Sequence, residues 1–129
     1  MNCIAAQYVY IGQGRLLKRH AIHFDKNGNA NAIKPFEGEM ASTIFINGIV
    51  CPSFVWPDKN ISLTPAEATA LLHRLWDKNR LLPVNDLLNF YTSSTELKLG
   101  SKPILWCIEK VDLLNLLFTD NFSVHAIFP

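Results

Sequence analysis

Hydrophobic and polar positions alternate over much of the first 55 residues, which indicates β-strands. Residues 3–11 alternate and are rich in strand-forming side chains, and a second short run follows at 20–25. Asn27-Gly28 supplies the positive φ angles of a tight hairpin, so residues 31–36 are predicted to return as a strand that ends near Pro35. Residues 42–54 form another β-rich run, broken by a second Asn-Gly pair at 47–48.

The middle of the chain changes to a helical period. Thr64, Pro65 and Glu67 have the spacing of a capping box with proline at the first helical position, so a helix is predicted over residues 64–79. Its apolar stripe consists of Ala68, Leu71, Leu72, Leu75 and Trp76. After a break at 80–83, a shorter helix is predicted at about 84–92, with Leu87, Leu88 and Tyr91 facing inward.

The last third returns to β-structure, with strands predicted within 102–111 and 122–128 and an apolar loop between them. Strands at both ends of the chain are expected to complete one sheet system. The prediction is a single domain over residues 1–129, mainly β with a helical insert: a small composite β-sandwich. It consists of a β segment at 1–56, a helical bridge at 57–95 and a β segment at 96–129.

Composition narrows the classes of function. The chain has 129 residues, is 49% hydrophobic and 18% charged, and carries a net charge of +1, which argues against nucleic-acid binding. Its short basic cluster at 15–20 is predicted to be a solvated loop or edge. Without an apolar run of about 20 residues or a signal peptide, and with three scattered cysteines, we expect a cytoplasmic protein that neither enters a membrane nor forms disulfides.

Two parts of the chain resemble a known family. Residues 7–35 ("QYVYIGQGRLLKRHAIHFDKNGNANAIKP"), 45–55 ("FINGIVCPSFV") and 86–128 are similar to the terminal segments of amidohydrolase-superfamily enzymes, closest to the cytosine-deaminase and aminodeoxyfutalosine-deaminase-like group. The resemblance covers roughly residues 3–56 and 84–128. In those enzymes the two segments form a composite β-sandwich beside a (β/α)₈ barrel, which needs at least about 200 residues. The resemblance therefore implies a sandwich whose barrel is missing and whose gap is bridged by a helix.

The same resemblance argues against the family's chemistry. The enzymes carry a His-x-His metal pair shortly after the stretch that Pro52–Val55 matches, and in this register Asp58 and Asn60 occupy the two positions. The remaining ligands would come from the absent barrel. We therefore expect no catalytic residue, no metal and no cofactor. The four histidines and Cys51 are interpreted as structural, with Cys51 a buried, inert thiol.

Loss of a barrel would expose apolar surface, and we expect the inserted helix to cover part of it and a homodimer the rest. The candidate interface or pocket residues are Trp56, Leu72, Trp76, Tyr91, Trp106, Leu117 and Phe118. Three functions stay open. We favour a non-catalytic interaction or scaffold domain, acting as a homodimer or with a protein partner. The alternatives are a subunit or cryptic form of a metal-dependent hydrolase or deaminase, and a small-molecule binder with Trp76, Trp106 and Tyr91 in its pocket.

Overall fold

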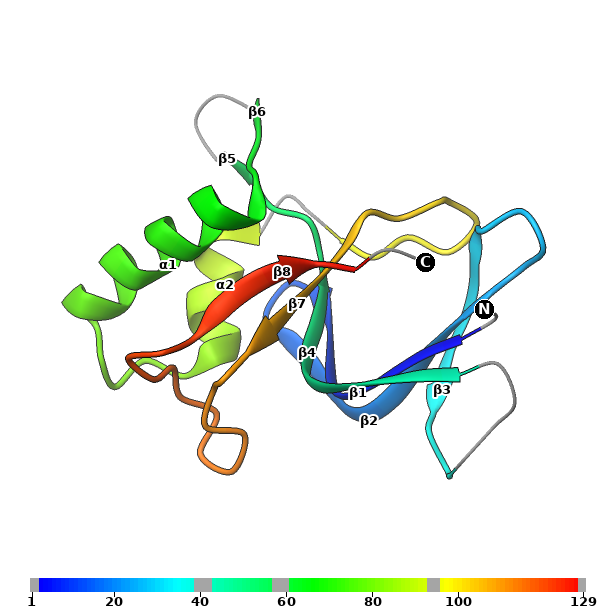
Figure 1. Cartoon of the computed structure of the whole chain (residues 1–129), viewed down its shortest axis with the longest axis horizontal. Helices are drawn as coiled ribbons and strands as arrows, with labels where there is room; N and C mark the ends of the chain where they lie inside the picture. Colours follow the sequence, from blue (N-terminus) through cyan, green and yellow to red (C-terminus); the bar gives the residue numbers. More distant parts are fainter. Residues whose placement is uncertain (1–2, 39–42, 57–60, 93–95, 128–129) are drawn as a thin grey trace.

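A computed structural model of the chain describes residues 3–38, 43–56, 61–92 and 96–127, without the side chains of 56, 61 and 90–92 (Figure 1). The described elements follow one another as β1 (Cys3–Gly12), β2 (Arg15–Phe24), β3 (Ala30–Pro35), β4 (Thr43–Pro52), β5 (Val55–Trp56), β6 (Ile61–Ser62), α1 (Pro65–Lys78), α2 (Val84–Thr92), β7 (Leu105–Glu109) and β8 (Ser123–Ala126). Six strands form one sheet in the order β3-β2-β1-β4-β7-β8, and β5 pairs with β6. The predicted mainly β fold with a helical insert is confirmed.

Strands from the two ends of the chain share this sheet, as predicted. β4 runs parallel to β1, with Ile44 opposite Ile4, and β7 runs antiparallel to β4, with Cys107 opposite Val50. The remaining neighbours in the sheet are antiparallel. The β4–β7 pair therefore joins the N-terminal three-strand unit to the C-terminal hairpin of β7 and β8.

The hairpin between β2 and β3 forms where it was predicted. Gly28 has a φ of 84°, and the Asp25 carboxylate accepts hydrogen bonds from the backbone N–H groups of Asn27 (2.9 Å) and Asn29 (3.0 Å). A positive φ costs glycine little, and a side chain at that position would be strained. The turn thus fixes the register of β3 against β2.

The basic cluster at 15–20, expected as a solvated loop or edge, begins β2. Among the described residues β3 pairs with β2 only from His20 onward, so residues 15–19 form an edge of the sheet and not a loop. The turn that precedes them is compact: the Tyr10 hydroxyl accepts a hydrogen bond from the Gly14 N–H at 2.9 Å. β2 consequently starts at Arg15, directly opposite Gly12. The charged side chains of Arg15, Lys18 and Arg19 are accommodated in a strand because they are exposed.

The second Asn-Gly pair does not end its strand, although the pairing of β4 with β1 shifts register there, between Ile46 and Ile49. β4 continues through Asn47 and Gly48. A Cβ atom at Gly48 would overlap with the carbonyl oxygen of Ile108 on β7. Glycine is needed here for the close approach of two backbones and not for a turn.

Helix α1 begins with the predicted capping box. The Thr64 hydroxyl accepts from the Glu67 N–H at 3.2 Å, and the Glu67 carboxylate accepts from the Thr64 N–H at 3.0 Å. These bonds lower the pKa of Glu67. The predicted apolar stripe is buried at Ala68, Leu71, Leu72 and Trp76. It packs with α2 against one face of the sheet, in a core that includes Tyr10, Ile49, Trp106 and Ile108 (Figure 1).

The opposite face of the sheet has its own apolar core. Ile4, Ala6, Val9, Ile22 and Val50 contribute to it together with Leu97 and Leu105. The segment 96–104 closes this side through backbone hydrogen bonds: Leu97 donates to Ile11, Ala30 donates to Ser101, and Gly100 donates to Ala30. The sheet therefore has a cover on both faces, helices on one and an extended segment on the other, which gives the domain a sandwich-like layering.

Helix α1 also closes the outer edge of β8. The Thr69 hydroxyl accepts a hydrogen bond from the Val124 N–H at 3.0 Å and donates to the Pro65 carbonyl at 2.8 Å. His73 Nε2 lies 3.0 Å from the Phe122 carbonyl oxygen, and its ring stacks on Phe122 at 3.8 Å. The structural role expected for His73 is thus to hold the helix against this edge.

The close approach at Gly48 predicts a large effect of a small substitution. Gly48→Ala places a methyl group against a backbone oxygen that cannot move aside, so the free energy of unfolding should fall by about 1–3 kcal/mol. Urea denaturation measures this change. As the control, Asn31→Ala on exposed β3 should stay within about 0.5 kcal/mol of the unmodified chain. Equal effects of both substitutions would contradict the close contact.

A second prediction concerns the hydrogen bond from the Val124 N–H on β8 to the Thr69 hydroxyl on α1. Thr69→Val keeps the side-chain shape but leaves the Val124 N–H without its acceptor, which should cost about 1–3 kcal/mol. The exchange of the Val124 amide hydrogen should also accelerate. Thr69→Ser retains the hydroxyl, so it should preserve most of the amide protection. Unchanged exchange at Val124 in the valine variant would show that this hydroxyl does not close the edge.

Candidate functional site

One open edge of the sheet lies where β4 and β7 separate. Their pairing runs only from Ile49 opposite Ile108 to Pro52 opposite Leu105. Lys110, with a φ of 61°, then turns the chain out of the sheet. Among the described residues, the first half of β4, residues 43–48, pairs with β1 alone. One backbone edge of this half strand is left without a neighbouring strand.

The loop that follows β7 is held in place by hydrogen bonds within the loop and to the start of α2. The Thr119 hydroxyl donates to the Lys110 carbonyl, and Asp112 and Leu117 exchange backbone hydrogen bonds. The Asp112 carboxylate also accepts from Asn115, which lowers the pKa of Asp112. The Leu116 carbonyl accepts from the Val84 N–H at 2.7 Å, which ties the loop to the start of α2. The gap beside β4 therefore has a fixed opposite wall.

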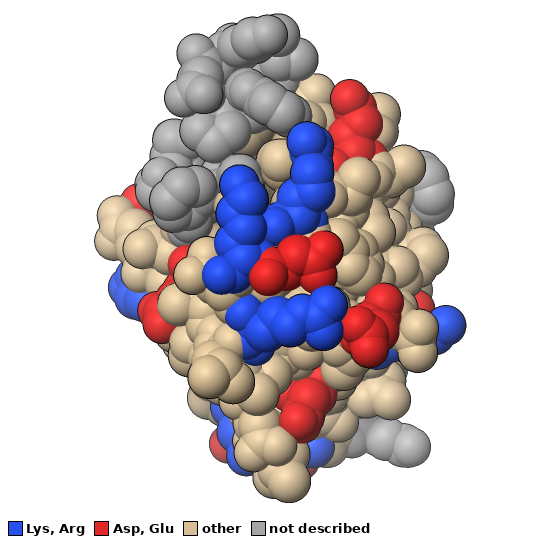
Figure 2. Space-filling model, turned by 90° about the vertical axis from the view of Figure 1, so that its left-hand side faces the viewer, with Lys and Arg blue, Asp and Glu red and all other residues tan. Residues whose placement is uncertain are grey.

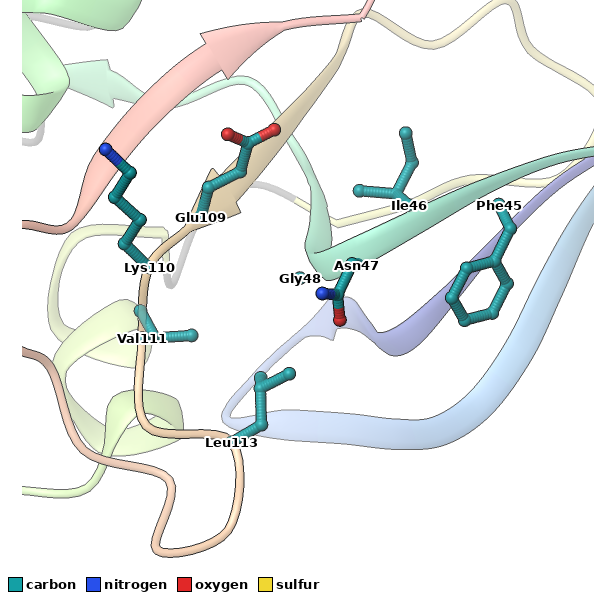
Figure 3. Close-up of a pocket in the computed structure, with 8 residues that line it drawn as sticks. All are labelled: Phe45, Ile46, Asn47, Gly48, Glu109, Lys110, Val111 and Leu113. Atoms are coloured by element: carbon teal, nitrogen blue, oxygen red, sulfur yellow. The ribbon is translucent and has the colours of Figure 1, made fainter.

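A pocket of about 480 Å³ occupies this gap (Figure 3). β4 contributes one wall, and the end of β7 with the following loop contributes the other. Its lining residues are Phe45, Ile46, Asn47, Gly48, Glu109, Lys110, Val111 and Leu113. Figure 3 shows Phe45 and Asn47 on one side of the β4 ribbon and Ile46 on the other. The pocket is thus a notch beside a strand edge, with the side chains of that strand alternating above and below it.

The half strand is apolar although it is exposed. Ile44 and Phe45 each leave 42% of their surface accessible, and the ring of Phe45 contacts Phe36 with centroids 5.6 Å apart. The lining residues of β4 carry no charge, whereas Glu109 and Lys110 place one charge of each sign on the opposite wall. The site is therefore suited to an extended, largely uncharged segment that forms main-chain hydrogen bonds.

The described side chains among the residues predicted as an interface or pocket do not line this notch. Leu72, Trp76, Trp106 and Phe118 meet in the core beneath the helices, each at most 6% exposed. Leu117 is half-buried on the loop that faces the notch. The side chains of Trp56 and Tyr91 lie outside the described part of the chain, as do Asp58 and Asn60 entirely. The four buried residues are brought together, but the protein itself encloses them.

Sequence reasoning missed Ile44 and Phe45. The run Thr43–Ile46 carries no charge and does not alternate, a pattern typical of a strand buried on both faces. Its exposure follows from Lys110, more than sixty positions later in the chain, where β7 leaves the sheet. The continuous apolar run indicated a strand without the usual alternation. It could not indicate that β7 would leave one backbone edge of that strand uncovered.

A second group of polar side chains lies on β7 and β8. The Ser123 hydroxyl is 2.8 Å from His125 Nε2, and a Glu109 carboxylate oxygen is 3.9 Å from that same nitrogen. A catalytic triad needs the nucleophile and the carboxylate on opposite ring nitrogens, so this imidazole cannot relay a proton between them. In the described part of the chain, moreover, no three His, Cys, Asp or Glu side chains are placed to hold a metal ion.

The cysteines have the environment of unreactive thiols. Burial, followed by the nearby Glu109 carboxylate, raises the pKa of Cys107 to about 11. Burial also raises the pKa of Cys51, and of Cys3. Because the thiolate is the nucleophilic form, little of either Cys51 or Cys107 would react near neutral pH. The interpretation of Cys51 as a buried thiol agrees with its complete burial.

Charges at the α1 end of the molecule are mixed in sign. Figure 2 shows basic and acidic side chains next to one another over this face. Arg80 pairs with Asp77 at 2.9 Å and lies 3.7 Å from Asp120, and its guanidinium stacks over Trp76. Neither helix in the described ranges is long and apolar enough to cross a membrane.

Comparison with protein-family models, with curated proteins and with solved structures finds no match for this chain.

The cysteine environments predict slow alkylation and a dependence of stability on pH. Native Cys51 and Cys107 should react with iodoacetamide near pH 7.5 much more slowly than the same thiols in urea. The raised folded pKa of Cys107 means that the unfolded thiol, with its ordinary pKa of 9.0, ionises first. Its stabilising contribution is complete below pH 9 and is lost as the pH rises toward about 11. A Cys107→Ala variant with the same alkaline loss of stability would contradict this assignment.

Proposed function

We propose that this chain is a non-catalytic remnant of an amidohydrolase composite domain and works as a protein-interaction or scaffold domain. The observation that carries the proposal is the apolar edge of β4, held open beside a fixed notch. Extended segments bind such edges by adding a strand, with main-chain hydrogen bonds for affinity and side-chain pockets for specificity.

The arrangement of the sheet supports the proposed origin. In the family that the motifs resemble, the sandwich is composed of both chain ends, and here β4 from the N-terminal segment pairs with β7 from the C-terminal one. The helical insert lies between these segments in sequence and over one face of the sheet in space. The proposed origin therefore rests on the sequence motifs and on this composite sheet.

The chemistry of the described residues supports a binding role over a catalytic one. The His125 cluster lacks the geometry of a proton relay, and the thiols of Cys51 and Cys107 have raised pKa values. All three cysteines are unbridged and buried, which is compatible with the reducing cytoplasm that we propose as its compartment.

Site-specific photocrosslinking in the producing cells tests the interaction role. The photoreactive p-benzoylphenylalanine replaces Phe45 at the strand edge, and in the control it replaces Leu81, which is 88% exposed between the helices. We expect irradiation to give a defined crosslinked protein adduct from position 45 and none from position 81. Equal labelling at the two positions, or none at position 45, would overturn the proposed interaction role.

Metal analysis and an activity assay test the proposal that the chain is not a catalyst. The purified chain should contain far less than an equimolar amount of zinc or iron by elemental analysis. It should release no ammonia from cytosine or other amino-substituted heterocycles when these metals are supplied. Equimolar metal together with deaminase turnover would establish a metal-dependent hydrolase instead.

A further inference from the structure

The open edges of the sheet, among the described residues, are treated differently. The first part of β2, which β3 does not cover, carries the exposed charges of Arg15, Lys18 and Arg19. The outer edge of β3 carries exposed Asn31, Lys34 and Pro35, and charge and proline on an edge strand hinder the addition of another strand. The outer edge of β8 is closed by Thr69 and His73 of α1. The half strand 43–47 of β4 has neither protection. Among the edges that the structure describes, this one alone combines apolar, strand-forming side chains with an uncovered backbone.

The sequence of this edge is nearly palindromic. Residues 43–47 read Thr-Ile-Phe-Ile-Asn, with polar residues outside, isoleucines inside and Phe45 at the centre. An antiparallel pair of two such strands centred on Phe45 would place phenylalanine opposite phenylalanine, isoleucine opposite isoleucine and threonine opposite asparagine. Each of these cross-strand pairs is favourable, because aromatic, β-branched and hydrogen-bonding partners are matched.

We propose that the partner bound at this edge is a second copy of the chain, joined by antiparallel pairing of residues 43–47 about a two-fold axis at Phe45. This inference rests on the proposed function and specifies its partner. A two-fold interface uses the same surface on both copies, so a segment that matches itself is what such an axis requires.

The notch limits the register of this pairing at one end. From Ile49 onward the edge of β4 is already occupied by β7, so an added strand must end near Asn47. Within that limit, the palindrome places the centre of the paired segment at Phe45, because this register alone matches residues 43–47 with themselves.

Electrostatics are compatible with two identical partners. The lining residues of β4 are uncharged, and Glu109 and Lys110 on the opposite wall carry one charge of each sign. The whole chain carries a net charge of only +1, so two copies repel each other weakly. Five paired residues bury less than the roughly 1,200 Å² of standard interfaces, so the dimer is expected to be weak.

Sedimentation equilibrium with a charge exchange tests the proposal. The unmodified chain, studied from about 10 μM to about 1 mM to span the expected weak affinity, should shift from monomer to dimer. Phe45→Lys and Phe45→Glu each place like charges directly opposite at the axis, so each should weaken dimerisation at least about tenfold. An equimolar mixture of the two variants should recover dimers, because a lysine then faces a glutamate.

Leu81→Lys is the matched control: it adds the same charge at an exposed apolar position away from the edge and should leave dimerisation unchanged. Hydrogen exchange of the unmodified chain gives a measurement independent of variant folding: within residues 43–47, the amides that point away from β1 should gain protection as the protein concentration rises. A monomer throughout the range, or dimers that the mixture does not restore, would overturn the proposal. An adduct at position 45 with a different protein, combined with a monomeric chain, would reject the homodimer and retain the interaction function.

Discussion

The contact between the Gly48 backbone and the Ile108 carbonyl is the constraint on which the rest of the structure depends. It brings β4 close enough to β7 for the two ends of the chain to share one sheet. Immediately beyond this contact, Lys110 adopts a left-handed backbone and β7 leaves β4. The same short region therefore unites the two halves of the sheet and leaves the first half of β4 uncovered. Assembly of the sheet and exposure of the β4 edge therefore both depend on the path of the chain from Ile108 to Lys110.

The helical insert serves more than one purpose. Its apolar stripe buries Leu72 and Trp76 against the sheet, and complete burial of such side chains stabilises a fold by about 1.5–3 kcal/mol each. The neighbouring Thr69 and His73 satisfy backbone groups at the β8 end of the sheet. One helix thus supplies a hydrophobic cover and an edge closure, whereas the β4 edge, at the other side of the β7–β8 hairpin, receives neither.

Features encoded by neighbouring residues could be predicted from the sequence. The capping box at Thr64 and Glu67, the stripe of α1 and the turn at Gly28 each depend on a few consecutive positions, and each was confirmed. The basic start of β2 and the path of β4 through Gly48 were not predicted, because both are decided by strands distant in sequence. The candidate site eluded prediction for the same reason: its open edge depends on where β7 ends. Trp76 and Trp106, in contrast, were assigned to a candidate small-molecule pocket, and the structure encloses both in the core.

The order of the strands in the chain also determines when each edge of β4 is covered during synthesis. β1, β2 and β3 can pair as they emerge, since short turns connect them, and β4 can then join β1. Its other edge must wait for β7, which begins only at Leu105, after both helices have been made. Until then the whole length of β4 is open on that side, so the nascent chain passes through a stage at which it is prone to aggregate. The completed fold retains half of that open edge.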